Sequence, residues 1–120
     1  MDGEVTVDEL DALLEEDDVR VVDVRSPEAF RRGHIPGSEN VPFGDLPDRV
    51  EELDGDDRVV TVCPHGKASV QAARLVASYE GFDGRVESLA EGLDGWQEAG
   101  HDVETDDVEE QTAEDVDAPF

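Results

Sequence analysis

Cysteine and lysine are nearly absent from this chain: each occurs once in 120 residues, at Cys63 and Lys67. Because one cysteine cannot close a disulfide within the chain, its thiol is free or bonded to another molecule. A reducing cytoplasm is the simplest compartment for such a thiol. The sequence also lacks an apolar run of about 18 residues or more, and it lacks a leader with basic and apolar parts. We therefore expect neither a membrane-spanning helix nor a signal peptide.

Basic residues are scarce: 9 lysines and arginines face 34 aspartates and glutamates, which gives a formal net charge of -25. Nucleic acids and anionic membranes are bound through basic patches that release counterions, so this balance argues against both as partners. The acidic groups repel one another at low salt, whereas a Debye length of about 3 Å in molar salt removes most of that repulsion. The composition favours a salt-adapted cytoplasm of the haloarchaeal type. The alternative is an ordinary acidic protein with a disordered acidic tail.

The length suggests a single domain with one core, and the composition changes near the end of the chain. From Asp102 onward nine of the 19 residues are acidic, none is basic and few are apolar. A segment of this composition cannot bury enough apolar surface to fold. We therefore divide the chain into a domain at 1–103 and an acidic, disordered tail at 104–120, which serves solubility or docking.

The stretch around the cysteine changes its hydrophobic period within a few residues. The β-branched run at 59–62 is typical of a buried parallel strand, and it stops at Cys63. Pro64 and Gly66 then break the strand, and from Ser69 the apolar residues follow helical spacing at Val70, Ala73 and Val76. The stretch therefore predicts a strand, a tight loop and a helix that Ser69 caps, with the thiol at the carboxyl end of the strand.

This position of the thiol favours an anion. A loop that leads into a helix presents unpaired backbone N–H groups and the positive end of the helix dipole. Cys63 should therefore ionise more readily than a free cysteine, whose pKa is about 8.5, and the thiolate is the nucleophilic form. Lys67 adds the only full positive charge of the loop. The alternative is that Cys63 is simply a buried apolar residue at a strand end.

The rest of the chain alternates helices with strands, which predicts an α/β sandwich with a parallel sheet. A capping box from Thr6 to Glu9 opens a helix over about 6–15, and Ser26-Pro27-Glu28 opens a short helix through Arg32. Sites in such sheets gather at the carboxyl ends of the strands. The remaining elements are expected as helices at 45–53 and about 93–96, strands at 19–24, 39–41 and 86–89, and a short strand that starts at Val5.

Four stretches of the sequence together resemble the single-domain rhodaneses, which are thiosulfate sulfurtransferases. The loop from Cys63 to Ala68 is similar to the active-site loop of this family. The resemblance covers about residues 5–101 in the same order. The other matching stretches are Val22-Asp23-Val24-Arg25, Gly33-His34-Ile35-Pro36-Gly37-Ser38-Glu39-Asn40, and the closing segment from Gly81-Phe82 through Val86, Leu89, Gly92 and Trp96.

The resemblance implies a rhodanese-like three-layer α/β/α sandwich around a five-stranded, mostly parallel sheet. It also implies sulfur transfer in two half-reactions without a cofactor. The Cys63 thiolate takes the outer sulfur of a small anionic donor such as thiosulfate, and a thiol or cyanide then removes it from the persulfide. Lys67 would attract the donor, and His65 either donates a hydrogen bond from the loop rim or has no task. The residues expected to bind the substrate are Pro64, His65, Gly66, Lys67, Ala68 and Ser69.

Two departures from the family pattern leave other functions open. Many members carry an arginine in or just after the loop, and neither Lys67 nor Ser69 offers the bidentate contact of a guanidinium. Glu91 stands where paired glycines are common and places an acid near the expected anion site. The alternatives are a non-catalytic rhodanese-like module or a sulfur carrier that hands persulfide to a partner in a sulfur relay, and a redox-sensing thiol. A cysteine phosphatase would need arginine at position 69 and is disfavoured.

A few further residues have both a structural and a functional interpretation. Asp23 and Arg25 end a second central strand and are candidates for support of the site, but a structural ion pair at the rim is favoured. His34 is expected to tie its loop to the backbone, since no second histidine or cysteine lies at ligand spacing. Trp96 lies three residues after Leu93, which favours the core over ligand stacking. We expect no metal site.

Overall fold

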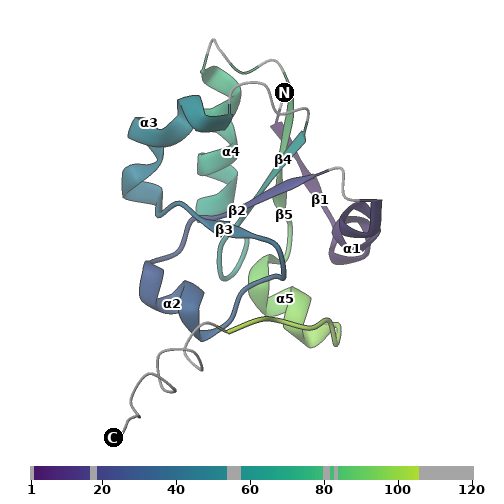
Figure 1. The fold of residues 1–120 in the computed structure, drawn as a ribbon. Coiled ribbons are helices and arrows are strands. Elements are labelled where there is room, and N and C mark those ends of the chain that lie inside the picture. The colour runs from purple at the N-terminus through teal and green to yellow at the C-terminus, as the bar shows by residue number, and fades with distance from the viewer. Residues whose placement is uncertain (1, 17–18, 54–57, 80–81, 83, 106–120) are drawn as a thin grey trace, which may run out of the picture.

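The computed structural model describes residues 2–16, 19–53, 58–79, 82 and 84–105. Helices and strands alternate along these residues, as predicted (Figure 1). Within them no helix is both long enough and apolar enough to cross a membrane. The elements, with 3₁₀ helices labelled η, are β1 (Asp2–Val5), α1 (Val7–Glu16), β2 (Arg20–Asp23), α2 (Pro27–Arg32), β3 (Glu39–Asn40), η1 (Phe43–Asp45), α3 (Leu46–Arg49), η2 (Val50–Leu53), β4 (Arg58–Val62), α4 (Ala68–Ser78), β5 (Arg85–Leu89) and α5 (Gly92–Glu98).

The strands form one sheet in the order β1-β5-β4-β2-β3, and every neighbouring pair is parallel. This arrangement confirms the predicted α/β sandwich around a five-stranded sheet. β4 lies at the centre, and the carboxyl ends of all the strands meet at one edge of the sheet, beside α2 and α5 (Figure 1). The loops that follow the strands collect at this edge, which is where ligand sites form in parallel sheets.

Successive residues of the central strands face opposite layers of helices. Val22 and Val59 belong to the cluster that packs against α3, η2 and α4. Val21 and Val60 belong to the cluster that packs against α1 and α5. All four are at most 2% exposed, and full burial of such a side chain contributes about 1.5–3 kcal/mol to stability. Cys63 lies in the first cluster, so the thiol is on the α4 side of the sheet.

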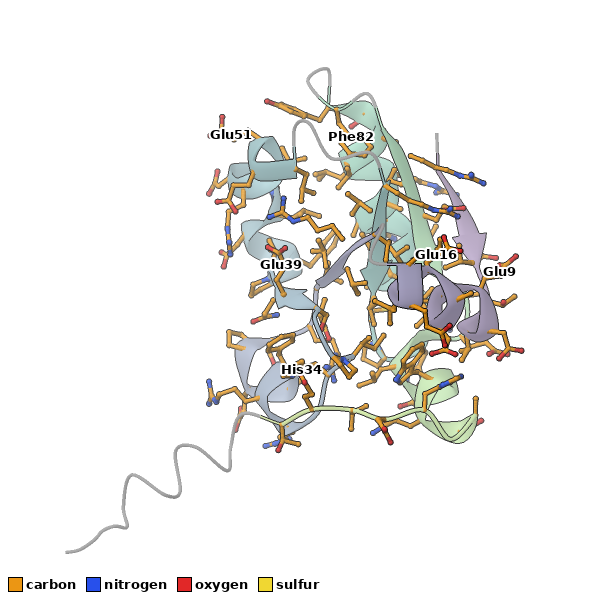
Figure 2. The ribbon with its side chains drawn as sticks, turned by 45° about the vertical axis from the view of Figure 1, so that its right-hand side comes forward. Glu9, Glu16, His34, Glu39, Glu51 and Phe82 are labelled. Carbon is orange, nitrogen blue, oxygen red and sulfur yellow. The ribbon has the colours of Figure 1, made fainter. Side chains whose placement is uncertain are left out.

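The helix starts predicted at Thr6 and Ser26 are both present. The Thr6 N–H donates to Glu9 Oε1 at 2.8 Å, and the Glu9 N–H donates to Thr6 Oγ1 at 3.1 Å, which is a complete capping box for α1. The Ala29 N–H donates to Ser26 Oγ at 3.2 Å at the start of α2. Acidic side chains such as Glu9 and Glu16 then line the outer side of α1, away from the sheet (Figure 2).

The sequence predicts a short strand that starts at Val5, but the strand in the structure, β1, precedes and ends at that residue. β1 ends at Val5 and pairs with β5 at the edge of the sheet. Three of its four residues are Asp, Gly and Glu, and they carry no alternating apolar pattern. Hydrophobic periodicity therefore could not reveal this strand.

The single helix predicted at 45–53 is divided into η1, α3 and η2. Pro47 accounts for the start of α3, because proline lacks an N–H and fits only the first turn of an α-helix. The inward-facing residues are nevertheless those predicted: Leu46, Val50 and Leu53 are all buried. Their spacing of four and then three residues suits an α-turn followed by a 3₁₀ turn.

The last described residues return to the loop that follows α2. The His34 N–H donates to Glu104 O at 2.9 Å, and the Glu104 N–H donates to His34 O at 2.8 Å. Trp96 is 2% exposed, as predicted for a core residue, and its Nε1 donates to Asp102 O at 2.8 Å. The chain therefore contacts the rest of the domain as far as Glu104. The domain boundary after residue 103 stays a prediction, because residues 106–120 of the predicted tail lie outside the described residues.

Candidate active site around Cys63

Cys63 directly follows β4 and is 2% exposed. Its Sγ accepts a hydrogen bond from the Gly66 N–H at 3.0 Å and lies 3.4 Å from Ser69 Oγ. The hydroxyl of Ser69 donates to the sulfur when Cys63 is a thiolate. Residues 63–67, which we term the Cys63 loop, therefore curl back on the sulfur and surround it with donors.

These donors change the ionisation of Cys63. Burial raises the pKa of the Cys63 thiol, whereas hydrogen bonds from the Ser69 hydroxyl and from the backbone N–H groups of Ser69, His65 and Gly66 lower it. The hydrogen bonds outweigh burial, so the pKa lies below its ordinary value. This is the direction expected from the sequence. A lower pKa enlarges the thiolate share at neutral pH, and the thiolate is the nucleophile.

The cap role predicted for Ser69 is wrong. α4 begins at Ala68 with Lys67 at the cap position, and the Lys67 side chain makes no capping hydrogen bond. Ser69 lies in the first turn, fully buried, and Thr61 Oγ1 donates to its carbonyl oxygen at 2.7 Å. Cys63 Sγ accepts from the Ser69 N–H in this turn and so takes the place of a capping side chain. The Ser69 hydroxyl therefore contacts the sulfur and does not cap the helix.

The six residues predicted to bind the substrate divide into a buried and an exposed set. The buried residues contact the sulfur, and the exposed ones lie at the rim of the Cys63 loop, where a donor or acceptor would approach. Buried are Gly66 and Ser69, half-buried is Ala68, and exposed are Pro64, His65 and Lys67.

Two glycines allow the Cys63 loop to touch the loop between β5 and α5. Gly66 has φ +87° and Gly92 has φ +68°, a region that favours glycine. A Cβ on Gly66 would clash with Ala90 O, and a Cβ on Gly92 would lie 2.5 Å from Pro64 O and 2.6 Å from Cys63 O. No larger residue fits at either position without movement of the backbone around the sulfur.

The start of α5 is fastened to the same loop by main-chain hydrogen bonds. The Leu93 N–H donates to Cys63 O at 2.8 Å, and the Asp94 N–H donates to Pro64 O at 3.0 Å. These bonds satisfy N–H groups that a helix start leaves unpaired. They also fix the position of the Asp94 side chain relative to the Cys63 loop.

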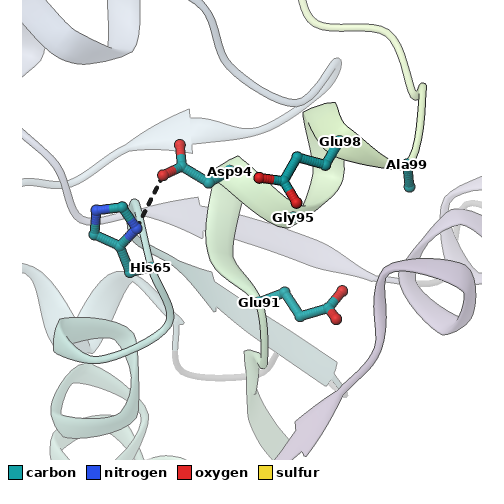
Figure 3. A pocket seen from close by; sticks show the side chains of 6 residues that line it. All are labelled: His65, Glu91, Asp94, Gly95, Glu98 and Ala99. Atoms are coloured by element: carbon teal, nitrogen blue, oxygen red, sulfur yellow. Dashed lines mark ion pairs between the residues drawn. The ribbon is translucent and has the colours of Figure 1, made fainter.

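An acidic pocket of about 600 Å³ lies between the Cys63 loop and α5 (Figure 3). His65 Nδ1 lies 2.9 Å from Asp94 Oδ2, and Figure 3 shows the two side chains pointing toward each other. Glu91 lies near the site, as the sequence predicts, whereas the sequence does not predict Asp94 there. No local motif marks that residue, and only the pairing of β4 with β5 brings it to His65. The pocket is lined by His65, Glu91, Asp94, Gly95, Glu98 and Ala99.

Asp23 and Arg25 form a buried ion pair at the end of β2, which is the structural role favoured from the sequence. Arg25 Nη2 donates to Asp23 Oδ2 at 2.7 Å, and the two side chains are 10% and 1% exposed. Arg25 Nη2 also donates to Gly33 O at 2.7 Å, and Asn40 Nδ2 donates to the carbonyl oxygens of both Asp23 and Arg25. These bonds tie the end of β2 to the loop that follows α2 and to the end of β3.

His34 also has the structural role predicted for it. Its Nδ1 lies 2.7 Å from Phe30 O, and its ring stacks on the Phe30 ring with centroids 3.8 Å apart. Within the described ranges, no group of three or more His, Cys, Asp or Glu side chains is arranged to hold a metal ion. His34 thus joins α2 to the loop that follows it.

Replacement of Ser69 by alanine should slow the alkylation of Cys63 by iodoacetamide at neutral pH. Loss of the hydroxyl removes a donor to the thiolate, so the pKa rises and the thiolate share falls. A hydrogen bond to a charged group contributes about 1.5–3 kcal/mol, which predicts a rate lower by about tenfold or more. The two rates should converge at high pH, where both thiols are ionised. Ser78→Ala, near the other end of α4, is the control, and equal rates for Ser69→Ala and wild type at every pH would refute the role of Ser69.

Comparison with known proteins agrees with this geometry. A model of the rhodanese-like domain matches residues 6–99. Thiosulfate sulfurtransferase GlpE of Shewanella oneidensis is 36% identical over 95 residues, which cover 79% of this chain and 92% of GlpE. YrkF of Bacillus subtilis, named as a candidate sulfur carrier protein, is 31% identical over 81 residues, or 68% of this chain and 43% of YrkF.

An HTH-type transcriptional regulator of Mycobacterium tuberculosis is 37% identical over 100 residues, or 83% of this chain. The chain spans only 44% of the length of that regulator. Among solved structures, a rhodanese-related protein of Thermoplasma volcanium superposes with a TM-score of 0.75 at 25% identity, covering 84% of this chain and 96% of that one. By its sequence, its all-parallel sheet and the place of Cys63 at the end of the central strand, this chain belongs to the rhodanese-like domain family.

Proposed function

We propose that this protein is a sulfurtransferase that carries sulfur as a persulfide on Cys63. The environment of the thiol carries the proposal: Cys63 lies at the carboxyl end of the central strand, and hydrogen bonds hold its pKa below the ordinary value. A nucleophilic thiol of this kind forms covalent intermediates. Similarity to the thiosulfate sulfurtransferase GlpE supports the reaction class.

In the first half-reaction the Cys63 thiolate attacks the outer sulfur of thiosulfate. A bond forms between the two sulfur atoms, the S–S bond of thiosulfate breaks, and sulfite leaves with the bonding electrons. The exposed Lys67 attracts the anionic donor to the rim of the loop. The N–H groups that now surround Sγ, such as that of Gly66, stabilise the negative charge of the persulfide.

In the second half-reaction a nucleophilic acceptor attacks the outer sulfur of the persulfide. Cyanide takes it as thiocyanate, and a thiol takes it as a new persulfide. The S–S bond to Cys63 breaks, and its electrons return to Sγ. The hydroxyl of Ser69 and the Gly66 N–H stabilise the thiolate that leaves, so the same donors serve both half-reactions.

A sulfur carrier is the second candidate function, and the similarity to YrkF favours it. A time course of thiocyanate formation with excess thiosulfate and cyanide separates the two candidates. An enzyme forms many equivalents of thiocyanate per Cys63, whereas a carrier that needs a partner protein exchanges slowly and forms about one equivalent. If wild-type protein neither binds sulfur nor forms thiocyanate, the domain is a binding module and the proposal fails.

We place this activity in the cytoplasm at high salt. A single reactive thiol suits a reducing compartment, and a net charge of -25 on 120 residues needs screening. The melting temperature should therefore rise by several degrees between about 0.1 and 2 M potassium chloride, since self-repulsion weakens as the Debye length falls. Thermal unfolding followed by circular dichroism measures this. A constant or falling melting temperature would contradict the assignment to a salt-rich cytoplasm.

A further inference from the structure

We propose that His65 is the general base that activates a thiol acceptor, and that Asp94 positions His65. The inference rests on the proposed function and adds to it the nature of the acceptor. A protonated thiol is a poor nucleophile, so its proton must be removed before it can attack the persulfide. The contact of His65 with Asp94 and its place on the Cys63 loop point to the His65 ring as the group that removes this proton.

The contact with Asp94 sets the tautomer of His65. A carboxylate only accepts hydrogen bonds, so the 2.9 Å contact between Asp94 Oδ2 and His65 Nδ1 places a proton on Nδ1. In the neutral ring Nε2 then has a free lone pair and acts as a base. Figure 3 shows this second nitrogen turned away from Asp94.

The backbone segments that carry the two side chains are held in place on both sides of His65. The Asp94 N–H donates to Pro64 O at 3.0 Å, directly beside His65. Gly66, on the other side of His65, has a φ that favours glycine and packs against the backbone at Ala90. A base held in this way loses little conformational entropy when the acceptor arrives.

His65 also lies on the loop that surrounds the sulfur. Cys63 is 2% exposed, so the outer sulfur of the persulfide, about 2 Å beyond Sγ, must be approached from outside this loop. The backbone N–H of His65 donates to Sγ, and the side chain of His65 is 70% exposed at that rim. The same side chain lines the pocket of about 600 Å³ that an acceptor can occupy.

The charges around His65 favour a neutral acceptor over an anionic one. Three carboxylates line the pocket with His65, from Glu91, Asp94 and Glu98, and Lys67 lies on the same loop as His65. On its other side Asp94 borders a smaller hollow of about 240 Å³ that Arg25 and Arg32 also line. An acceptor that enters this pocket is therefore favoured when it is uncharged, as a protonated thiol is. An uncharged thiol is the acceptor that needs a base.

The proposed step conserves atoms and electrons. The thiol proton moves to His65 Nε2 as the thiol sulfur attacks the outer sulfur of the persulfide. The new S–S bond forms, the bond to Cys63 Sγ breaks, and its electron pair leaves Cys63 as a thiolate. The proton then passes from His65 to the new persulfide or to water. No oxidant or reductant is needed.

The test uses protein loaded chemically, so that it does not depend on thiosulfate as the donor. Sodium tetrasulfide converts Cys63 to its persulfide, and the loss of that sulfur to a thiol is followed by intact mass in single turnovers. One thiol is 2-mercaptoethanol, which is mainly protonated at neutral pH, and the other is 5-thio-2-nitrobenzoate, which is already ionised. The variants are His65→Ala and Asp94→Asn, with Glu51→Gln, an exposed carboxylate of η2 outside the pocket, as the matched loss of one negative charge.

His65→Ala should slow transfer to 2-mercaptoethanol by about 10²-fold, which is the usual contribution of a general base, and should change transfer to 5-thio-2-nitrobenzoate little. Added imidazole should restore the rate of His65→Ala but not that of Asp94→Asn, which still carries the ring. Asp94→Asn should lose about tenfold with 2-mercaptoethanol, and Glu51→Gln should stay within about twofold of wild type.

Equal losses with both thiols, or no rescue by imidazole, would show that His65 is not a base. A loss in Glu51→Gln as large as that in Asp94→Asn would show that the loss of any carboxylate has this effect, so that Asp94 does not position His65. Failure of the proposed function has a different signature, since wild type would then form no persulfide on Cys63 with tetrasulfide, and both proposals would fall. If wild type forms the persulfide from tetrasulfide but not from thiosulfate, thiosulfate is not the donor. The role of His65 as a base is then still tested, because the loaded protein still transfers its sulfur to the two thiols.

Discussion

Cys63→Ser should form no thiocyanate from thiosulfate and cyanide above the uncatalysed rate. A serine hydroxyl does not ionise at neutral pH in this environment and cannot hold sulfur as a persulfide. The fold should survive, because the hydroxyl is of similar size and finds the same partners, the Gly66 N–H and Ser69 Oγ. Steady-state thiocyanate formation measures the loss of activity, and thermal unfolding measures the retained fold.

The result is informative only if the variant is folded. A free energy of unfolding within about 1 kcal/mol of the wild-type value would show that it is, since conservative changes at satisfied sites have small effects. Residual thiocyanate formation at a tenth of the wild-type rate would contradict the role of Cys63. The described chain offers no second thiol that could replace it, since Cys63 is the only cysteine of the sequence.

Gly92→Ala should destabilise the protein by more than about 3 kcal/mol and abolish sulfur loading. An alanine with φ near +68° costs about 1–2 kcal/mol on its own. The added Cβ also lies 2.5 Å from Pro64 O and 2.6 Å from Cys63 O, so the Cys63 loop or the start of α5 must move. Such a loss is a large part of the 5–15 kcal/mol that a domain of this kind has in total.

Gly100→Ala is the matched control for Gly92→Ala. Gly100 has φ +89°, and a Cβ there would meet nothing within 4 Å, so this variant measures the cost of the backbone conformation alone. It should lose about 1–2 kcal/mol and keep its activity. Urea unfolding of both variants gives the difference directly. Equal losses would show that the contact between the two loops contributes nothing to the site.

The Cys63 region was predictable because its signals are local. A β-branched run before Cys63, two backbone breakers and a switch to helical spacing define β4, the loop and the start of α4 without any long-range information. The capping box at Thr6 and the cap at Ser26 are local in the same sense, and both are present. Sequence alone therefore located the strand end, the thiol and the direction of its pKa change.

The parts that could not be predicted depend on contacts between distant segments. Ser69 has the residue type of a helix cap, but the thiol accepts from the N–H groups that a cap would satisfy, and this requires the loop geometry. Asp94 meets His65 only because β5 lies beside β4, which periodicity does not reveal. The predicted position of the polar edge strand β1 is wrong by a few residues for the same reason, because only its pairing with β5 shows where it lies.

The central claim is that Cys63 carries transferable sulfur, and the mass of the intact protein tests it most directly. Wild type is incubated with thiosulfate in about 1 M potassium chloride, which screens its acidic charge, and is then treated with cyanide. Wild type should gain the mass of one sulfur atom, cyanide should remove that sulfur as thiocyanate, and Cys63→Ser should gain none. Folded wild-type protein that gains no sulfur, or a folded Cys63→Ser variant that gains as much as wild type, would contradict the role of Cys63 as the carrier.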